Sequence, residues 1–134
     1  FPLPTTFVVT GLERVRDLAE RLAAARVPLV DLVGCSDLAQ GLAAVAACDL
    51  VVSEDGAFLH AAWCGGVPTV ALLGSTRSDW VRPLGPHARH RGSEDLPCGG
   101  CMAATCARGD LHCLERIGVE EVVGLALEVL RPRR

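Results

Sequence analysis

Short apolar runs alternate with longer amphipathic stretches through roughly the first eighty residues of the chain. The runs predict four strands, at Thr6–Thr10, Leu29–Val33, Leu50–Ser53 and Thr69–Leu73. They are continuous and do not alternate with polar residues, which is typical of parallel strands covered on both faces. The spacing of about twenty residues is that of consecutive βα units, so the pattern predicts a parallel sheet flanked by helices.

Helical periodicity predicts a helix after each of the first three strands. The first carries an apolar stripe at 3.6-residue spacing and ends before Pro28. The second has Ser36 as its N-cap and runs to about Ala47. The third begins near Ala57 and stops at Gly65, next to a second glycine and a nearby proline. The residues predicted to face inward on the first two helices are Leu12, Val15, Leu18, Ala19, Leu22 and Ala23, then Leu38, Leu42, Val45 and Ala46.

From Gly74 to about Gly118 the periodicity is lost, and this long segment contains many Pro, Gly and Cys residues. A long irregular segment inside a compact domain is usually functional or cross-linked. A final amphipathic helix is predicted from Val119 to Leu130. A basic tail follows, and a solvated terminus is the favoured interpretation of it over weak contact with anionic lipid. Its cations are Arg131, Arg133 and Arg134.

The composition favours one soluble domain and excludes several kinds of chemistry. A chain of 134 residues, half of them apolar, can bury one sizeable core. The net charge of −3 does not indicate a nucleic-acid partner. The sequence has no Lys, which removes Walker-type phosphate binding, Schiff-base chemistry and the receiver-domain site. No apolar run approaches the ~20 residues that span a bilayer, and no secretory signal is visible, so a cytoplasmic location is expected.

The loop after the third strand is the strongest candidate for a ligand site. In open parallel sheets, ligands bind beyond the carboxyl ends of the strands. Small residues follow Asp55 there and open a helix whose amides and positive dipole end suit a phosphate, and His60 lies on the first turns of that helix. Two alternatives stay open, because an isolated His on an apolar helix is often a packed residue and an Asp-Gly pair is often only a turn. No dinucleotide fingerprint follows the first strand and no serine-hydrolase elbow is present.

Four of the seven cysteines crowd into sixteen residues near the end of the chain. Four thiolates satisfy a tetrahedral structural zinc ion, and His112 is an alternative ligand. Such a metal would leave no open position for catalysis. Disulfides, which are rare in reducing compartments, and free thiols in a compact loop are the other interpretations. The cysteines are Cys98, Cys101, Cys106 and Cys113.

An ordered set of motifs over about 120 residues resembles the C-terminal domain of glycosyltransferase family 9, the ADP-heptose:lipopolysaccharide heptosyltransferases. The match begins at Val8-Val9-Thr10-Gly11 and continues through Gly34-Cys35-Ser36-Asp37-Leu38. It is strongest over Asp49–Ala62 and follows the same pattern over Gly65–Thr76. The last matching part is the cysteine-bearing stretch from Cys98 to Leu114, followed by Ile117 and the terminal helix.

The resemblance implies an α/β, Rossmann-like domain that forms the C-terminal half of a GT-B glycosyltransferase. It implies that residues 1–134 bind the sugar-nucleotide donor, with an irregular Cys-rich segment at about 96–114. An N-terminal acceptor domain, expected to hold the catalytic residues, is absent from this stretch. The donor contacts implied by the resemblance are Asp55, Gly56, Ala57 and His60, with Ser36 in a loop that faces the nucleoside and Glu13 near the ribose.

The chain departs from the family pattern beside Asp55. The family usually shows Asp, then Ser or Thr, then Gly, whereas this chain has Gly56 and Ala57. The hydroxyl is therefore missing, and Ala57 adds a methyl group where backbone should approach the diphosphate. Backbone amide contacts to a diphosphate are compatible with both changes.

The implied function is transfer of a sugar from a nucleotide-diphospho-sugar to lipopolysaccharide core or a related surface glycan. ADP-heptose is the candidate donor, and the resemblance implies no cofactor for catalysis. The partners are the donor and a glycolipid acceptor held through the N-terminal domain, at the inner face of the cytoplasmic membrane with at most peripheral contact. The fragment alone is expected to be inactive. Two alternatives stay open: a non-catalytic Cys-rich binding module on this fold, and a nucleotide-sugar isomerase or epimerase of GT-B architecture.

Overall fold

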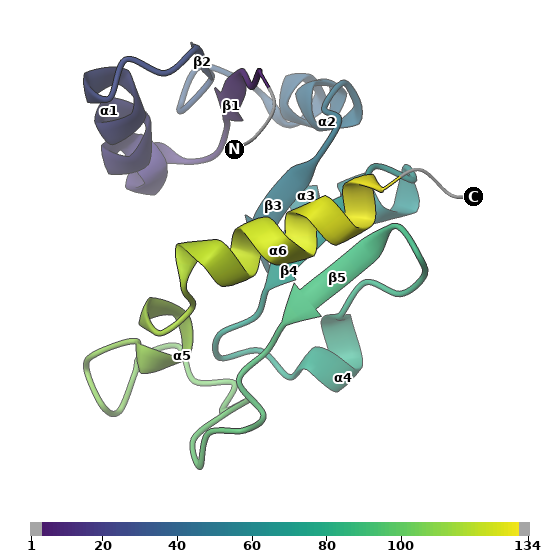
Figure 1. Ribbon diagram of the computed structural model, residues 1–134. Coiled ribbons are helices and arrows are strands. Elements are labelled where there is room, and N and C mark those ends of the chain that lie inside the picture. Colours follow the sequence, from purple (N-terminus) through teal and green to yellow (C-terminus); the bar gives the residue numbers. More distant parts are fainter. Residues whose placement is uncertain (1–3, 132–134) are drawn as a thin grey trace. The chain divides into compact units, whose positions relative to one another are not determined.

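The computed structural model describes residues 4–131, which fall into two compact units (Figure 1). One lies within Phe1–Ala47 and the other within Cys48–Arg134. Each has its own small parallel sheet, so the parallel α/β architecture predicted from the apolar runs is confirmed. Arg133 and Arg134 of the basic tail lie outside the described residues. No helix among the described residues is long and apolar enough to cross a membrane.

The first unit is a βαβ unit followed by a helix. Its two strands are parallel, and Phe7 pairs with Leu29. Both strands are shorter than predicted but lie inside the predicted ranges. The elements are β1 (Phe7–Val9), the short 3-10 helix η1 (Glu13–Val15), α1 (Arg16–Ala24), β2 (Leu29–Asp31) and α2 (Leu38–Ala46).

The core of this unit is small and forms where α1 covers β1 and β2. Val9, Ala19 and Val33 are buried, and Val15, Leu22 and Leu29 pack against them. Leu12 and Leu18 were predicted to face inward but are 72% and 50% exposed. The prediction was wrong at Leu12 because the first turn is a 3-10 helix, whose three residues per turn break the 3.6-residue stripe.

The start of α2 differs from the prediction by one residue. Asp37, not Ser36, is the N-cap, because its carboxylate accepts a hydrogen bond from the Gln40 amide at 2.8 Å. The Gln40 side chain accepts one from the Asp37 amide at 2.9 Å, which completes a capping box. The buried residues are Gly41 and Val45, while Leu38 and Ala46 stay exposed because packing covers only the middle of the helix.

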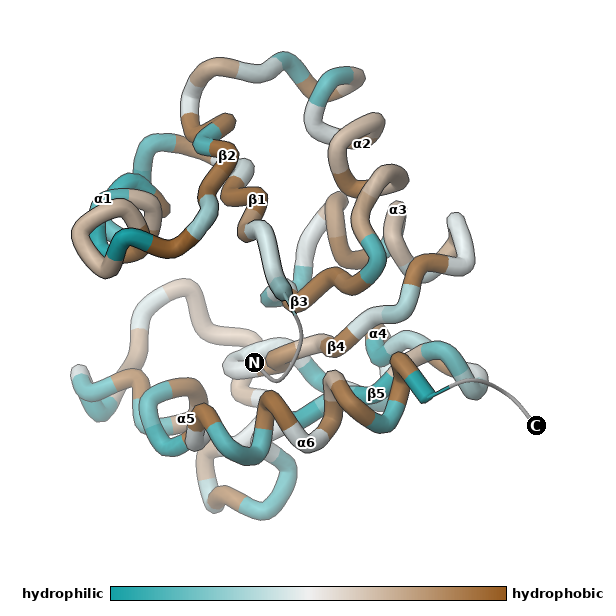
Figure 2. Tube along the Cα trace, turned by 45° about the horizontal axis from the view of Figure 1, so that its top comes forward, coloured by the Kyte–Doolittle hydropathy of each residue, from teal (hydrophilic) through white to brown (hydrophobic). Residues whose placement is uncertain are grey.

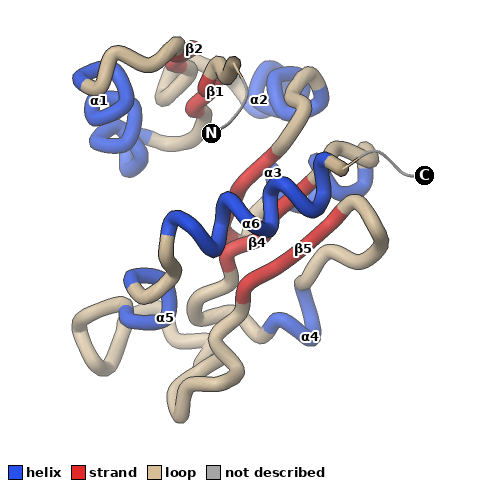
Figure 3. Tube along the Cα trace, viewed as in Figure 1, coloured by secondary structure: helices blue, strands red, loops and turns tan. Residues whose placement is uncertain are grey.

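The second unit is a three-stranded parallel sheet in the order β3-β4-β5, drawn with its helices in Figure 3. The register pairs Val51 with Thr69 and Thr69 with Ala88. The elements are β3 (Val51–Glu54), α3 (Ala57–Cys64), β4 (Thr69–Leu72), α4 (Ser78–Val81), β5 (Ala88–Arg91), α5 (His112–Glu115) and α6 (Val119–Leu130).

The central strand β4 is covered on both faces. Val70 packs against Ala126 and Val129 of α6, whereas Ala71 packs with Leu59 of α3 on the other side. Successive side chains of a strand point to opposite faces, so one four-residue strand supports two layers of helix. Figure 1 shows α6 crossing in front of the sheet and α3 behind it, and Figure 2 shows alternating hydrophobic and hydrophilic residues along α6. The predicted ranges of α3 and α6 are confirmed.

The segment from residue 74 to 118 contains three elements that periodicity did not predict: α4, β5 and α5. β5 reads Ala-Arg-His-Arg and lies at the edge of its sheet. Its two arginines form ion pairs with Glu128 and Glu121 of α6, so the strand lacks the apolar run that marked the other strands.

Candidate functional site

The loop between β3 and α3 is the candidate donor site. Glu54 ends β3 at the carboxyl edge of the sheet, and α3 begins soon afterwards at Ala57. Gly56 is the N-cap of α3, and no side chain caps the helix. The first-turn amides therefore have no side-chain acceptor, as an anion-binding helix terminus requires.

Asp55 and His60 are brought together at this helix start. The Nε2 atom of His60 lies 3.2 Å from Oδ1 of Asp55. Both side chains are partly exposed, at 31% for Asp55 and 41% for His60. The His60 ring also meets Trp63 edge-on, with 6.4 Å between ring centroids. A carboxylate and an aromatic ring thus hold the imidazole in one orientation beside the open helix terminus.

Gly56 leaves open space in front of this helix terminus. Its backbone is extended, with φ at 162°, and a Cβ built there meets no atom within 4 Å. A Ser or Thr, as in the family pattern, would therefore fit at position 56 without moving a neighbour. The missing hydroxyl removes one polar group from the loop and leaves its backbone unconstrained by side-chain packing.

Glu13 and Ser36 lie in the first unit, just beyond β1 and β2. Arg16 donates to Glu13 at 3.0 Å, to Asp31 at 2.5 Å and to the Val33 carbonyl at 2.6 Å. The hydrogen bond to Glu13, helped by the charge of Asp31, raises the pKa of Arg16. Arg16 thereby fixes the position of Glu13 at the carboxyl end of the small sheet.

Ser36 is tied to the same end of the two strands. Its hydroxyl donates to the Leu32 carbonyl at 3.3 Å and lies 3.4 Å from the Thr10 hydroxyl. Gly34, two residues earlier, has φ at +66°, and a Cβ there would lie 2.9 Å from Oε2 of Glu13. The structure thus brings Glu13 next to the loop that carries Ser36.

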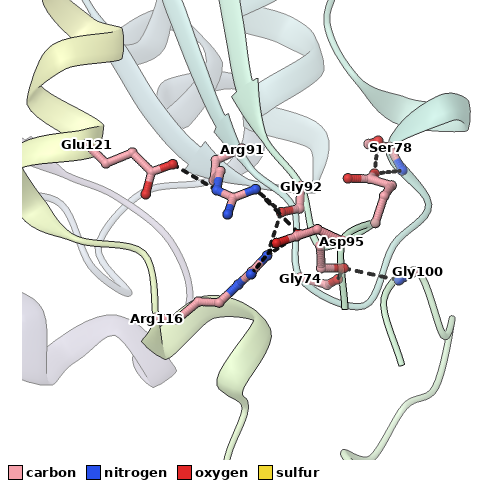
Figure 4. A network of polar contacts seen from close by, with 10 residues as sticks. Gly74, Ser78, Arg91, Gly92, Asp95, Gly100, Arg116 and Glu121 are labelled. Carbon is pink, nitrogen blue, oxygen red and sulfur yellow. Dashed lines mark hydrogen bonds and ion pairs between the residues drawn. The ribbon is translucent and has the colours of Figure 1, made fainter. Parts of the chain in front are cut away.

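The Cys-rich segment is fastened to the end of β5 by a charged network (Figure 4). Arg116, after α5, donates twice to the Asp95 carboxylate, at 2.5 and 2.6 Å. Arg91, on β5, lies 3.6 Å from Asp95 and 2.8 Å from Glu121 of α6. The hydrogen bonds from Arg116 hold the pKa of Asp95 well below its usual range. The network therefore joins β5, the Cys-rich segment and α6.

The four cysteines predicted to bind zinc are free thiols in the structure, and Cys98 and Cys101 are exposed. Among residues 4–131, no group of three or more His, Cys, Asp or Glu side chains is placed to hold a metal ion. The structure thus does not assemble the four thiols, nor His112 with them, and zinc binding stays a prediction. Backbone amides of the loop from Arg108 to Leu111 lower the pKa of Cys106.

A pocket of about 350 Å³ lies beside the loops that follow β4 and β5. Sequence reasoning missed it. One of its two loops could have been found from the sequence, because ligands bind beyond the carboxyl ends of parallel strands and the loop after β4 lies at such an end. The second loop was not recognised because the charged strand β5 was not predicted. The lining residues are Arg77, Asp79, Glu94, Gly99 and Gly100.

A family model described as glycosyltransferase family 9 (heptosyltransferase) matches residues 8–112 of the chain. The chain belongs to glycosyltransferase family 9. The resemblance seen in the motifs is therefore confirmed, and the helix start at Asp55 lies inside the matched range.

Relatives of this family 9 chain include heptosyltransferases. The lipooligosaccharide heptosyltransferase 2 of Campylobacter jejuni is 29% identical over 87 residues, which are 65% of this chain and 27% of that protein. The crystal structure of the family 9 glycosyltransferase from Veillonella parvula matches with a TM-score of 0.76 at 23% identity, over 93% of this chain and 36% of that one. The Escherichia coli ADP-heptose lipopolysaccharide heptosyltransferase II matches with a TM-score of 0.59 at 24% identity, over 92% of this chain and 37% of that one.

These two structures show that the family 9 chain has the Rossmann-like α/β fold. The chain spans between 27% and 37% of the length of the relatives named above. The single donor-binding domain predicted for residues 1–134 stays a prediction, because the described residues form two units and the comparisons do not assign a ligand to either.

Proposed function

We propose that this chain is the donor-binding part of a sugar transferase that uses a nucleotide-diphospho-sugar, with ADP-heptose as the candidate. The acceptor is lipopolysaccharide core or a related surface glycan. Membership of family 9 supports the reaction class. The observation that carries the site is the Asp55–His60 pair beside the uncapped start of α3.

Each part of this loop has a role in holding the donor. The free amides at Gly56 and Ala57 and the positive end of the α3 dipole bind the diphosphate. His60, whose Nε2–H donates to Asp55, donates a hydrogen bond to the same group through Nδ1, which requires a proton on both ring nitrogens when the donor is bound. The Asp55 carboxylate would repel a phosphate directly, so its roles are to orient His60 and to accept hydrogen bonds from sugar hydroxyls.

The nucleoside contacts in this proposal are the ones that the family resemblance implies, and the residues concerned belong to the first unit. Its loop from Gly34 to Leu38 carries Ser36 and follows β2, where nucleotides bind in open α/β sheets. Glu13 accepts hydrogen bonds from the ribose hydroxyls, and Arg16 keeps its carboxylate in place.

The chemistry of transfer depends on groups outside this chain. A base and an acceptor site are expected in an N-terminal domain, and orientation of donor and acceptor supplies much of the acceleration in such reactions. We therefore expect donor binding without turnover, no cofactor requirement, and at most peripheral contact with the inner face of the cytoplasmic membrane. Mixing the chain with ADP-heptose and a core glycolipid should give no product; measurable transfer would contradict this expectation.

Zinc in the Cys-rich segment remains part of the proposal as a structural ion only. If Cys98, Cys101, Cys106 and Cys113 converge on zinc, metal analysis will find one ion per chain. Chelation will then increase amide exchange from residue 96 to 114 and leave β3 and β4 protected. Metal-free protein of unchanged stability would rule zinc out.

Calorimetric titration with ADP-heptose, ADP and UDP-sugars tests the donor site. We expect saturable binding of one nucleotide class and a loss of about tenfold or more in affinity in both Asp55→Ala and His60→Ala. The matched control is Asp110→Ala, which removes the same side chain as Asp55→Ala elsewhere in the same unit. Absence of binding in the wild type would favour the alternative, a non-catalytic module on this fold.

A further inference from the structure

The pocket beyond β4 and β5 shares no lining residue with the donor site described above. It lies between the loop after β4, which carries Arg77 and Asp79, and the loop after β5, which carries Glu94, Gly99 and Gly100. The in-register strands place the end of β5 two strands away from the end of β3. With about 4.8 Å between strands, the start of this second loop is roughly 10 Å from the loop of Asp55.

Hydrogen bonds between the two loops hold the pocket open without a ligand. The hydroxyl and amide of Ser78 both donate to Oε1 of Glu94. The hydroxyl of Ser93 donates to the Gly74 carbonyl at 2.6 Å and accepts from the Gly100 amide at 3.1 Å. Ser78 and Ser93 are both buried. A site whose supporting side chains are already bonded loses little freedom when it binds.

The lining of the pocket includes a guanidinium, that of Arg77, and a carboxylate, that of Asp79, which are paired with each other. Arg77 donates to both oxygens of Asp79, at 3.0 and 2.6 Å, and these bonds lower the pKa of Asp79. The Arg77 guanidinium also lies over the ring of Trp80, 4.9 Å from its centroid. Trp80 is 65% exposed and lies outside the lining of the pocket.

The charges of the lining restrict the ligand. One Arg against two carboxylates gives a net charge of −1, which disfavours a second phosphate group. A hard cation is also disfavoured, because the part of the chain that the structure describes has no group of three or more potential metal ligands. The neighbouring hydrogen-bond donors and acceptors of the lining suit a neutral polyhydroxyl compound.

We infer that this pocket is a sugar-binding subsite, in which Asp79, Glu94 and Arg77 form hydrogen bonds with ring hydroxyls. The inference rests on the proposed function for its biological meaning, because the sugar is either the one carried by the donor or one in the acceptor glycan. Both sources present the same chemistry to the pocket, and the variants below separate them.

Asp79→Asn and Glu94→Gln test the subsite with little risk to the fold. Both replacements keep the shape of the side chain, and the amide oxygen introduced at position 94 can still accept from Ser78. Asp110→Asn is the matched control, because Asp110 forms the same two-residue-spaced pair with Arg108, at 2.9 Å, away from the pocket lining. Binding of ADP, ADP-heptose, a methyl heptoside and a heptose-terminated core oligosaccharide is measured by calorimetry and saturation-transfer NMR. Unfolding curves check that each variant is folded.

If the pocket binds the sugar of the donor, both variants lower the affinity for ADP-heptose about tenfold and leave the affinity for ADP unchanged. If the pocket binds a sugar of the acceptor, both variants lower the affinity for the oligosaccharide and leave the affinities for ADP and ADP-heptose unchanged. Methyl heptoside binding that is lost only in the two pocket variants supports the subsite even where no nucleotide binds and the proposed function fails. The inference is overturned if no sugar-bearing probe binds the wild type, or if the pocket variants bind every probe as the wild type and Asp110→Asn do.

Discussion

Gly99 lies in a turn of the loop after β5, where its backbone comes close to that of Ser93. A Cβ built at Gly99 would collide with the carbonyl group of Ser93, whereas one built at Gly124, on the exposed face of α6, meets nothing within 4 Å. We expect Gly99→Ala to lower the free energy of unfolding by about 1–3 kcal/mol through overpacking. Gly124→Ala should raise it by up to about 1 kcal/mol, because Gly is a poor helix former. Urea unfolding of both variants measures the difference, and equal effects would refute the packing argument.

The corrected cap of α2 gives a second prediction at the scale of single residues. Asp37→Ala removes the acceptor for the Gln40 amide and should cost about 0.5–2 kcal/mol in stability of the first unit. Ser36→Ala is the control, since Ser36 makes only bonds of 3.3 Å or longer and does not cap the helix. Amide exchange at the start of α2 reads the effect. A larger loss of stability in Ser36→Ala than in Asp37→Ala would indicate that Ser36 is the N-cap of α2, as the sequence predicts.

At the scale of elements, the Asp95–Arg116 pair decides whether the Cys-rich segment stays on the sheet. Asp95→Asn should increase amide exchange from residue 93 to 118 and speed alkylation of Cys113, while β3 and β4 stay protected. Asp110→Asn leaves this network intact and serves as control. Because the folded pKa of Asp95 is lowered, its contribution is fully present above the unfolded value of about 4 and is lost progressively as the pH falls from there through the folded pKa. A difference between wild type and Asp95→Asn that persists unchanged well below that pH would contradict the assignment.

Some of the helices and strands could be predicted from the sequence, and others could not. The ranges of α3 and α6 could be predicted because an apolar stripe coincides with a clear stop or start, such as Gly65 for α3. β4 could be predicted because both its faces are buried. β5 could not, since an edge strand made of Ala, Arg and His has no apolar run. Asp55 and His60 were found from spacing at a strand end, whereas the pocket depends on Glu94 reaching Ser78 across sixteen residues, a contact that local patterns do not encode.

At the scale of the whole molecule, the two units differ in how much core each can bury. The unit within Cys48–Arg134 has a central strand covered by α3 and α6, whereas the described residues of the other form two strands of three residues each and a small cluster around Val9. A two-stranded sheet is marginal alone in water, while three strands packed against helices are independently stable. We therefore expect a fragment of residues 48–134 to keep its helix content in the absence of urea and to unfold cooperatively when urea is added. A fragment of residues 1–47 should be largely unfolded without urea. Circular dichroism during urea titration checks both. If the fragment of residues 48–134 also binds ADP, the diphosphate contacts lie at α3 as proposed. If the fragment folds but its affinity for ADP-heptose is no higher than that of the full chain with Asp55→Ala, the contacts at Glu13 and Ser36 contribute most of the affinity instead.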